Sequence, residues 1–295
     1  MEDGYFTLMQ QLAPDLAQEI ELRALVLERI GALQPVGRRQ LAARLNLPER
    51  EVRTVATLLK KHGLITLDAA GMCLTPAAES VLPMARRFSR DLKGLTRLET
   101  ALAERLGVDK VCVAAGNADT DPHVLGEVGR IAGTRLRGFL QTGCTLAVTG
   151  GSTIREVAFA VPQGTPMNVM VVPARGGMGG ALETQANTLA CEIARRLGGH
   201  HRMMHLPDHL DEQALQEMRK LTEIDETLAL LERADVVLHG VGRADDMTQR
   251  RQLPGPVSAE VLRKGAVAEA YGCYFDRRGR LVYSASTVAH NLGAL

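Results

Sequence analysis

The feature that most constrains the fold is an alternation of short β-prone segments with helical segments that begins at Lys110. Such alternation is typical of a parallel sheet that helices cover on both faces. We expect strands at 111–114, 146–148, 169–172, 203–206 and 236–238, and helices near 122–141, 153–161, 182–197 and 222–233. A hairpin over 273–276 and 281–284 is expected to follow. The second half of the chain is therefore predicted to be a Rossmann-like α/β domain.

The stretch Thr149-Gly150-Gly151-Ser152 lies between a predicted strand and the next helix. Glycines let the backbone approach a ligand closely, and the N–H groups and dipole of a helix start favour an anion. The hydroxyls of Thr149 and Ser152 would add donors. An ordinary βα turn can have the same composition, so on this stretch alone a plain turn remains the more frequent explanation.

Further polar side chains follow other predicted strands, whose carboxyl ends meet at one edge of a parallel sheet. These side chains are Arg175, Gln185, Arg250, Arg251 and Glu269. The planar guanidinium of Arg175 suits a phosphate, and the carboxylate of Glu269 can accept hydrogen bonds from sugar hydroxyls. Only 3% of the residues are aromatic, which argues against a stacked base. The combination favours a phosphorylated sugar over a nucleotide.

No cofactor is expected from the Gly240-Val241-Gly242 segment. It lacks both the third glycine of a dinucleotide fingerprint and, on the sequence pattern, the helix that should follow.

The N-terminal part has the pattern of a winged helix-turn-helix DNA-binding domain. The expected elements are helices over 5–34, 37–45 and 49–62 and hairpin strands over 64–67 and 72–75. Asn46-Leu47-Pro48 forms the turn between the two short helices, and Gly63 ends the second one. The hairpin lies directly after that helix, which is the position of a wing.

Local charge supports DNA binding, although the whole chain has a net charge of only +1. Between Val36 and Gly63 there are seven basic and two acidic residues, an excess of five positive charges. The expected major-groove residues are Arg50, Arg53, Thr54 and Thr57, and the expected phosphate contacts are Arg38, Arg39, Lys60 and Lys61. A solvated helical hairpin with ordinary surface arginines is the alternative. The turn, the glycine stop and the wing together favour DNA binding.

We expect a winged-helix domain over 1–75, a linker helix over 76–107 and an effector domain over 108–295. Leucines spaced by three or four mark the linker helix: Leu92, Leu95, Leu98, Leu102 and Leu106. This stripe could pack on its own domain or on a second copy. We expect it to share in forming a homodimer or homotetramer.

Several other classes of protein are disfavoured. No run of eighteen apolar residues predicts a membrane span. The five cysteines are scattered without a CxxC pair, so we expect buried free thiols in a reducing cytoplasm. His201, His205 and His209 are spaced by four, but Pro207 interrupts any helix there, and no metal site is expected. No serine–histidine or cysteine–histidine pair can be argued, so no catalytic residue is assigned.

Five motifs carry a family resemblance. They are Val148-Thr149-Gly150-Gly151-Ser152, Pro173-Ala174-Arg175-Gly176-Gly177, Gln185-Ala186-Asn187-Thr188, Arg250-Arg251 and Glu269-Ala270-Tyr271-Gly272-Cys273-Tyr274-Phe275-Asp276. With them the chain resembles, over nearly its whole length, transcriptional regulators of the sugar-binding SorC/DeoR type, and within that type the branch of central glycolytic genes regulators.

The resemblance implies an allosteric repressor of glycolytic or other sugar-metabolism genes. Its effector would be fructose 1,6-bisphosphate or a related sugar phosphate. The effector domain would be similar to sugar-phosphate isomerases and deaminases, but without catalysis. The residues implied to contact the effector are Thr149, Gly150, Gly151, Ser152, Arg175, Gln185, Arg250, Arg251 and Glu269.

Two departures from the family pattern are visible. Ser152 stands where the relatives usually have threonine, which keeps the hydroxyl. The family pattern continues beyond Leu295 with a strand, a glycine turn and a helix, including a lysine expected to reach one phosphate. The sequence is therefore expected to be short of that pattern.

Two other functions stay open at this point. One is a sugar-phosphate isomerase, deaminase or kinase fused to a DNA-binding module, with Glu269 or Asp246 as the base. The other is an activator that responds to an unphosphorylated sugar. Turnover of a sugar phosphate would favour the first, and indifference of ligand affinity to loss of Arg175 or Arg250 would favour the second.

Overall fold

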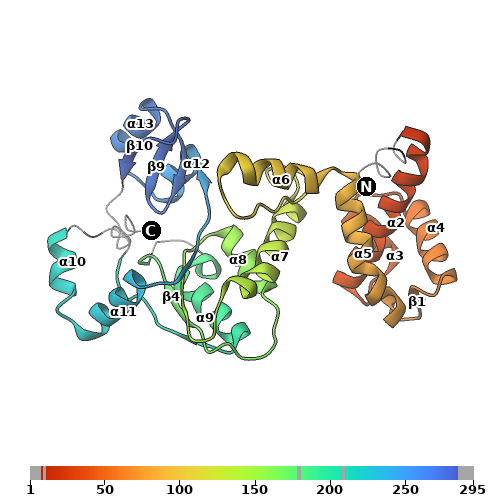
Figure 1. Ribbon diagram of the computed structural model, residues 1–295, viewed down its shortest axis with the longest axis horizontal. Helices are drawn as coiled ribbons and strands as arrows, with labels where there is room; N and C mark the ends of the chain where they lie inside the picture. The colour runs from red at the N-terminus through yellow and green to blue at the C-terminus, as the bar shows by residue number, and fades with distance from the viewer. Residues whose placement is uncertain (1–7, 9–10, 178–180, 208–209, 211, 285–295) are drawn as a thin grey trace. The chain divides into compact units, whose positions relative to one another are not determined.

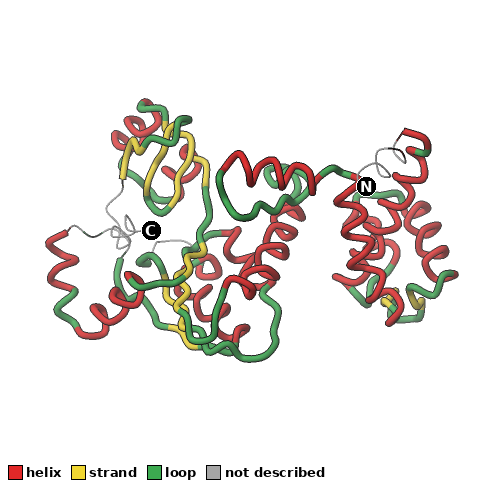
Figure 2. Tube along the Cα trace, viewed as in Figure 1, coloured by secondary structure: helices red, strands yellow, loops and turns green. Residues whose placement is uncertain are grey.

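The structure of the protein, a computed structural model, describes residues 8, 11–177, 181–207, 210 and 212–284 (Figure 1). The chain divides into two compact units, Met1–Ala115 and Gly116–Leu295. Among the described residues the first unit contains one cluster of buried apolar side chains and the second contains three. Helices dominate the first unit, and the second also contains two groups of strands (Figure 2).

The described part of the first unit contains α2 (Pro14–Leu33), α3 (Arg38–Leu45), α4 (Glu49–Lys61), β1 (Ile65–Leu67), β2 (Met72–Leu74), α5 (Pro76–Leu92) and α6 (Leu95–Leu106). Asn46 follows α3 with a left-handed φ of 52°, which turns the chain sharply toward α4. β1 and β2 pair antiparallel, with Ile65 opposite Leu74. These elements agree with the predicted helices and hairpin. Residues 5–7 and 9–10 of the first predicted helix lie outside the described residues.

Two helices, α5 and α6, occupy the region where the sequence predicts one linker helix. Lys93 and Gly94 separate them, and Gly94 has a φ of 66°, which favours glycine. Thr75 caps α5 by accepting a hydrogen bond from the backbone N–H of Ala78. Both helices belong to the first unit.

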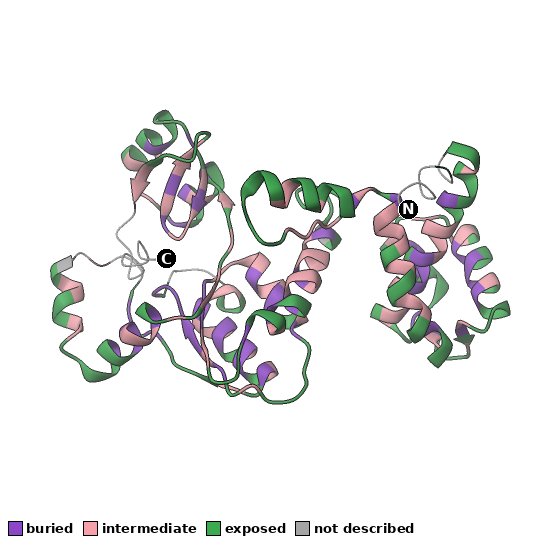
Figure 3. Cartoon of the chain, in the orientation of Figure 1, coloured by how far each residue is buried: buried purple, intermediate pink, exposed green. Residues whose placement is uncertain are grey.

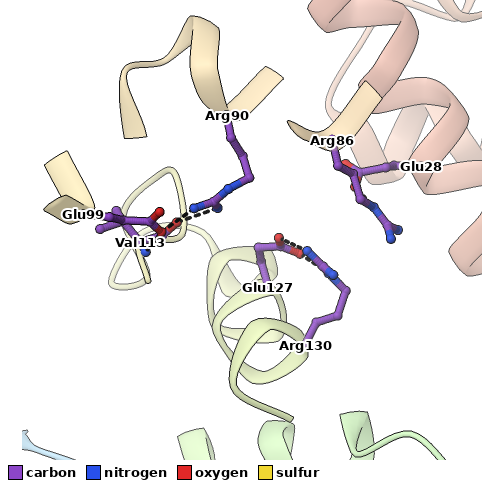
Figure 4. Close-up of polar contacts among 7 residues, drawn as sticks. All are labelled: Glu28, Arg86, Arg90, Glu99, Val113, Glu127 and Arg130. Atoms are coloured by element: carbon purple, nitrogen blue, oxygen red, sulfur yellow. Dashed lines mark hydrogen bonds and ion pairs between the residues drawn. The ribbon is translucent and has the colours of Figure 1, made fainter. Parts of the chain in front are cut away.

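The prediction of a strand at 111–114 is wrong, because side chains rather than a neighbouring strand bind the backbone there. The carboxylate of Glu99 accepts the N–H of Val113 at 2.6 Å, and Arg90 donates to the carbonyl oxygen of Val113 at 2.9 Å. Arg90 and Glu99 also pair with each other. Figure 4 shows both side chains turned toward Val113. The segment is β-prone in composition, but both backbone polar groups of Val113 are bound by these side chains.

The second unit contains a four-stranded parallel sheet of order β5-β4-β3-β6. Its strands are β3 (Thr145–Val148), β4 (Met170–Pro173), β5 (His200–His201) and β6 (Val236–Leu238). Its helices are α7 (Pro122–Phe139), α8 (Ser152–Ala160), α9 (Ala186–Leu197), α10 (Glu212–Met218) and α11 (Thr222–Glu232), with a short 3-10 turn at Leu182–Thr184.

Successive residues of the central strands point to opposite faces of this sheet. Leu146 and Val148 belong to a core cluster with side chains of α7, α8 and α9. Ala147 belongs to another cluster, with side chains of α11. Figure 3 shows these strands mostly buried. The parallel sheet covered on both faces is therefore confirmed.

The strand predicted at 203–206 is displaced: the paired residues are His200 and His201. Asn187 explains the difference, because its side-chain amide binds both backbone groups of Met204. The N–H of Met204 donates to Oδ1 at 2.8 Å, and Nδ2 donates to the Met204 carbonyl at 3.0 Å. A side chain thus takes the place of a neighbouring strand.

A second, antiparallel sheet of order β10-β9-β8-β7 includes the predicted hairpin. Its strands are β7 (Gly242–Arg243), β8 (Ala266–Ala270), β9 (Cys273–Asp276) and β10 (Leu281–Ser284), with helices α12 (Ala244–Arg250) and α13 (Gly255–Arg263). The prediction that no helix follows Gly242 is wrong. Asp245 and Asp246 lie in the first turn of α12, where the helix dipole favours acidic residues.

The cysteines are free, but the prediction that all five are buried is wrong. Cys191 is exposed because it lies on the side of α9 opposite the buried residues Leu189 and Ile193. The other four are half-buried. Among the described helices, none combines the length and the hydropathy needed to cross a bilayer.

Candidate anion site and nucleic-acid interface

The turn from Thr149 to Ser152 joins β3 to α8 and is packed against the start of α9. Gly151 has a φ of 118°, and its N–H donates to the carbonyl of Thr184 at 2.9 Å. A Cβ on Gly150 would lie 2.5 Å from that same carbonyl oxygen. Both glycines are therefore required by the backbone, and the turn lies next to Gln185, which precedes α9.

The loops that follow the parallel strands meet at one edge of the sheet, as predicted. The N–H of Thr149 donates to the carbonyl of Leu238 at 3.0 Å, which ties the loop after β3 to the end of β6. The N–H of Ala174 donates to the carbonyl of Val148 at 2.7 Å, which ties the loop after β4 to the end of β3. Arg175 follows Ala174 and therefore lies at this edge.

Three charged side chains form a buried cluster, which we call the Arg175–Glu269–Arg251 cluster. The Glu269 Oε1 atom lies 3.7 Å from Nη1 of Arg175, pairs with Arg251, and accepts the N–H of Gly272 at 2.5 Å. Arg175 and Glu269 are each 3% exposed and Arg251 is 7% exposed. Two guanidinium groups thus bind one carboxylate, in the way that they would bind a phosphoryl oxygen.

Arg250 lies in a different environment from its neighbour Arg251. Its side chain is 58% exposed and pairs with Asp246 at 2.8 Å. It borders a polar pocket of about 430 Å³ whose other lining residues are Asp119, Arg243, Asp245, Asp246 and Gln249. Hydrogen bonds from Arg243 hold the pKa of Asp245 below its ordinary value. Successive helical residues point about 100° apart, which separates the two arginines.

The nine predicted contact residues therefore fall into two groups, and one residue lies outside both. Thr149, Gly150, Gly151 and Ser152 form the turn before α8, and Gln185 lies next to it. Arg175, Arg251 and Glu269 form the buried cluster. Arg250 faces the polar pocket. Sequence reasoning missed Tyr271, whose ring contacts His239 after β6 (ring centroids 5.5 Å apart). The sequence signals were its place in the motif that begins at Glu269 and its position before a glycine at a turn between two strands.

No group of three or more His, Cys, Asp or Glu side chains in the described part of the chain is arranged to hold a metal ion. His209, one of the three histidines considered from the sequence, lies outside the described residues.

The basic surface of the first unit is carried by α3 and α4. α4 buries Val52, Val55, Ala56 and Leu59 on one face. The residues predicted to face DNA are all exposed: Arg38, Arg39, Arg50, Arg53, Thr54, Thr57, Lys60 and Lys61. The face of α4 that carries Arg50, Arg53, Thr54 and Thr57 is thus open to a partner.

An acidic residue, Glu49, pairs with two arginines of this surface. Its Oε1 atom lies 3.2 Å from Nη2 of Arg53, and its Oε2 atom lies 3.4 Å from Nε of Arg39. The hydrogen bond from Arg53 and the charge of Arg39 hold the pKa of Glu49 below its ordinary value. A DNA phosphate that binds either arginine would compete with this carboxylate.

Two family models match successive parts of the chain. A family described as "CggR N-terminal DNA binding domain" matches residues 20–88, and one described as "Putative sugar-binding domain" matches residues 90–295.

Two curated relatives are similar over nearly the whole chain, and both are called central glycolytic genes regulator. That of Priestia megaterium is 36% identical over 290 residues, which are 98% of this chain and 85% of the relative. That of Bacillus subtilis is 33% identical over 284 residues, which are 96% of this chain and 84% of the relative.

Solved structures show the same fold. A putative SorC family transcriptional regulator from Enterococcus faecalis is 31% identical with a TM-score of 0.60, over 65% of this chain and 78% of that one. The full-length sorbitol operon regulator SorC from Klebsiella pneumoniae is 17% identical with a TM-score of 0.61, over 92% of this chain and 83% of that one, which is a likeness in fold alone.

Proposed function

Because this chain belongs to the family of DNA-binding transcriptional regulators with a sugar-binding domain that includes the central glycolytic genes regulators, we propose that it is a repressor controlled by a phosphorylated sugar. The membership confirms the resemblance seen in the motifs. The repressor role, the effector and the glycolytic target genes are the proposal. Because a transcriptional regulator binds chromosomal DNA, the proposal includes a cytoplasmic location.

The observation that carries the effector proposal is the Arg175–Glu269–Arg251 cluster at the carboxyl edge of the sheet. Two guanidinium groups there already bind an internal carboxylate, and a phosphoryl group offers the same kind of oxygen ligand with more charge. The first turn of α8, which begins at Ser152, would supply backbone N–H groups, and Thr149 and Ser152 would supply two hydroxyls.

A bisphosphate has two charged ends, and Arg250 is the proposed partner of the second one. Its present partner Asp246 is half-exposed, so that exchanging this carboxylate for a phosphoryl group costs little. Fructose 1,6-bisphosphate is the effector that we propose, with all nine predicted residues as its contacts. The similarity to the fold of sugar-phosphate isomerases and deaminases remains part of this proposal.

For DNA binding we propose that α3, α4 and the β1–β2 hairpin act as a winged helix-turn-helix. The exposed face of α4 with Arg50 and Arg53 would enter the major groove. Two copies would read a palindromic operator.

Leu98 and Leu106 of α6 are 45% and 64% exposed, which supports a part for the leucine stripe in a homodimer or homotetramer.

Catalysis is not part of the proposal. The two carboxylates considered as bases are both bound to guanidinium groups, Glu269 to Arg251 and Asp246 to Arg250. The curated relatives are regulators by name.

The test is operator affinity with and without fructose 1,6-bisphosphate, measured by fluorescence anisotropy at fixed salt. We expect the sugar phosphate to weaken operator binding at least tenfold, which corresponds to about 1.4 kcal/mol of coupling. By linkage, operator DNA should weaken sugar phosphate binding by the same factor. A sugar phosphate that clearly binds while operator affinity stays constant would refute the proposed control.

A further inference from the structure

Tyr271 occupies the first corner of the two-residue turn that joins β8 to β9, between the paired residues Ala270 and Cys273. Its φ is 60°, and that of Gly272 is 85°. Left-handed backbone at both corners belongs to the tight hairpin turn in which Asn-Gly and Gly-Gly are favoured. The Cβ of a tyrosine disfavours this conformation, so contacts of the side chain must hold it there.

Those contacts lie at the carboxyl edge of the parallel sheet. The Tyr271 ring packs against the core cluster that includes Ala147 and Ala174. The ring also meets His239 edge-on, at an interplanar angle of 70°. Ala174 directly precedes Arg175, and His239 directly follows β6. The ring therefore reaches from its own sheet to the place where the loops after β4 and β6 come together.

The hydroxyl of Tyr271 is buried there, and within the described residues it has no hydrogen-bond partner. Burial raises the pKa of this phenol, and the positive charge of Arg175 only partly opposes the rise, so the group is protonated and can donate. The oxygen of Glu269 that pairs with Arg175 also accepts the N–H of Gly272, the residue after Tyr271. This shared acceptor fixes the turn beside the guanidinium group.

We propose that Tyr271 is a further effector-binding residue, whose hydroxyl donates a hydrogen bond to an oxygen of the phosphoryl group held by Arg175. This inference rests on the proposed function. Oε1 of Glu269 lies 3.7 Å from Arg175 and accepts the N–H of Gly272, and the Tyr271 ring packs against the cluster that contains Ala174, so the phenol and the guanidinium group belong to the same neighbourhood. A protonated phenol adds a donor without adding charge, which suits a phosphate monoester whose outer oxygens accept hydrogen bonds.

The test is Tyr271→Phe in the full chain, with fructose 1,6-bisphosphate and inorganic phosphate as probes in titration calorimetry. Affinity for the bisphosphate should fall about 12- to 150-fold, the value of one hydrogen bond to a charged group. The melting temperature of the chain without effector should stay the same or rise, because the substitution removes a buried hydroxyl that the described residues leave unsatisfied. A hydroxyl with a purely structural partner would instead lower it.

Tyr283→Phe is the matched control. It removes the same atom from β10, which β9 separates from β8, and it should leave affinity unchanged. If the natural chain binds the bisphosphate and Tyr271→Phe binds it equally well, the inference is wrong and the proposed function stands. A variant that loses both stability and affinity also overturns the inference. If the natural chain binds no sugar phosphate, the proposed function fails, and the inference fails with it.

Discussion

Replacing Glu269 by Gln tests whether the buried cluster is organised by charge. Glu269→Gln keeps the size and an acceptor oxygen but removes the negative charge that Arg175 and Arg251 share. Removing one partner of a buried ion pair costs about 3–5 kcal/mol. Because the amide oxygen can still accept from Arg251 and from the N–H of Gly272, we expect the low end, about 3 kcal/mol. For a unit of this size that lowers the melting temperature by about 6–12 °C.

The assay is thermal unfolding at neutral pH in buffer without phosphate. Asp246→Asn is the control, because it removes an acid from the exposed pair with Arg250 and should change stability by less than about 1 kcal/mol. Combining Glu269→Gln with Arg251→Met should recover part of the loss, because the second substitution removes one of the buried charges. A melting temperature of Glu269→Gln equal to that of the natural chain would refute the reasoning.

Three further predictions concern the effector, the DNA and pH. Arg250→Ala, at an exposed position, should weaken fructose 1,6-bisphosphate binding by about 10- to 150-fold in calorimetry; an unchanged affinity would favour an unphosphorylated sugar. Arg53→Ala should weaken operator binding about 5- to 150-fold in anisotropy with effector affinity intact, whereas Lys61→Ala should mainly lower the salt dependence, by about one unit of slope. Hydrogen bonds from Arg280 lower the pKa of Asp276, so the stability that they give the β9–β10 hairpin is complete above the ordinary pKa of 3.8 and is lost as pH falls through the lowered value. Asp276→Asn should remove this acid dependence from the melting curve, and an identical dependence in both chains would contradict it.

The periodic elements could be predicted because their patterns repeat. In α4 the apolar residues recur with the helical period, and the exposed arginines and threonines lie where that period puts them. The meeting of the loops after β3, β4 and β6 follows from the geometry of any parallel sheet, so the position of Arg175 at the carboxyl edge was predictable too.

The parts of the fold that could not be predicted depend on contacts made by single side chains. Residues 111–114 and 203–206 have strand composition, but Arg90, Glu99 and Asn187 bind their backbones across the fold. Neither the strand propensity of a segment nor the spacing of its residues indicates such a contact. Adjacent arginines in a motif also look equivalent in sequence, whereas the end of α12 buries Arg251 and exposes Arg250.

The shortness of β5 has a consequence for aggregation. β5 lies at one edge of the parallel sheet and pairs with β4 through only two residues. An open edge with unpaired N–H and carbonyl groups is a template on which another polypeptide can add a strand. An edge strand as short as β5 offers such a polypeptide few backbone groups to pair with. Its brevity therefore works against edge-to-edge association between copies of the chain.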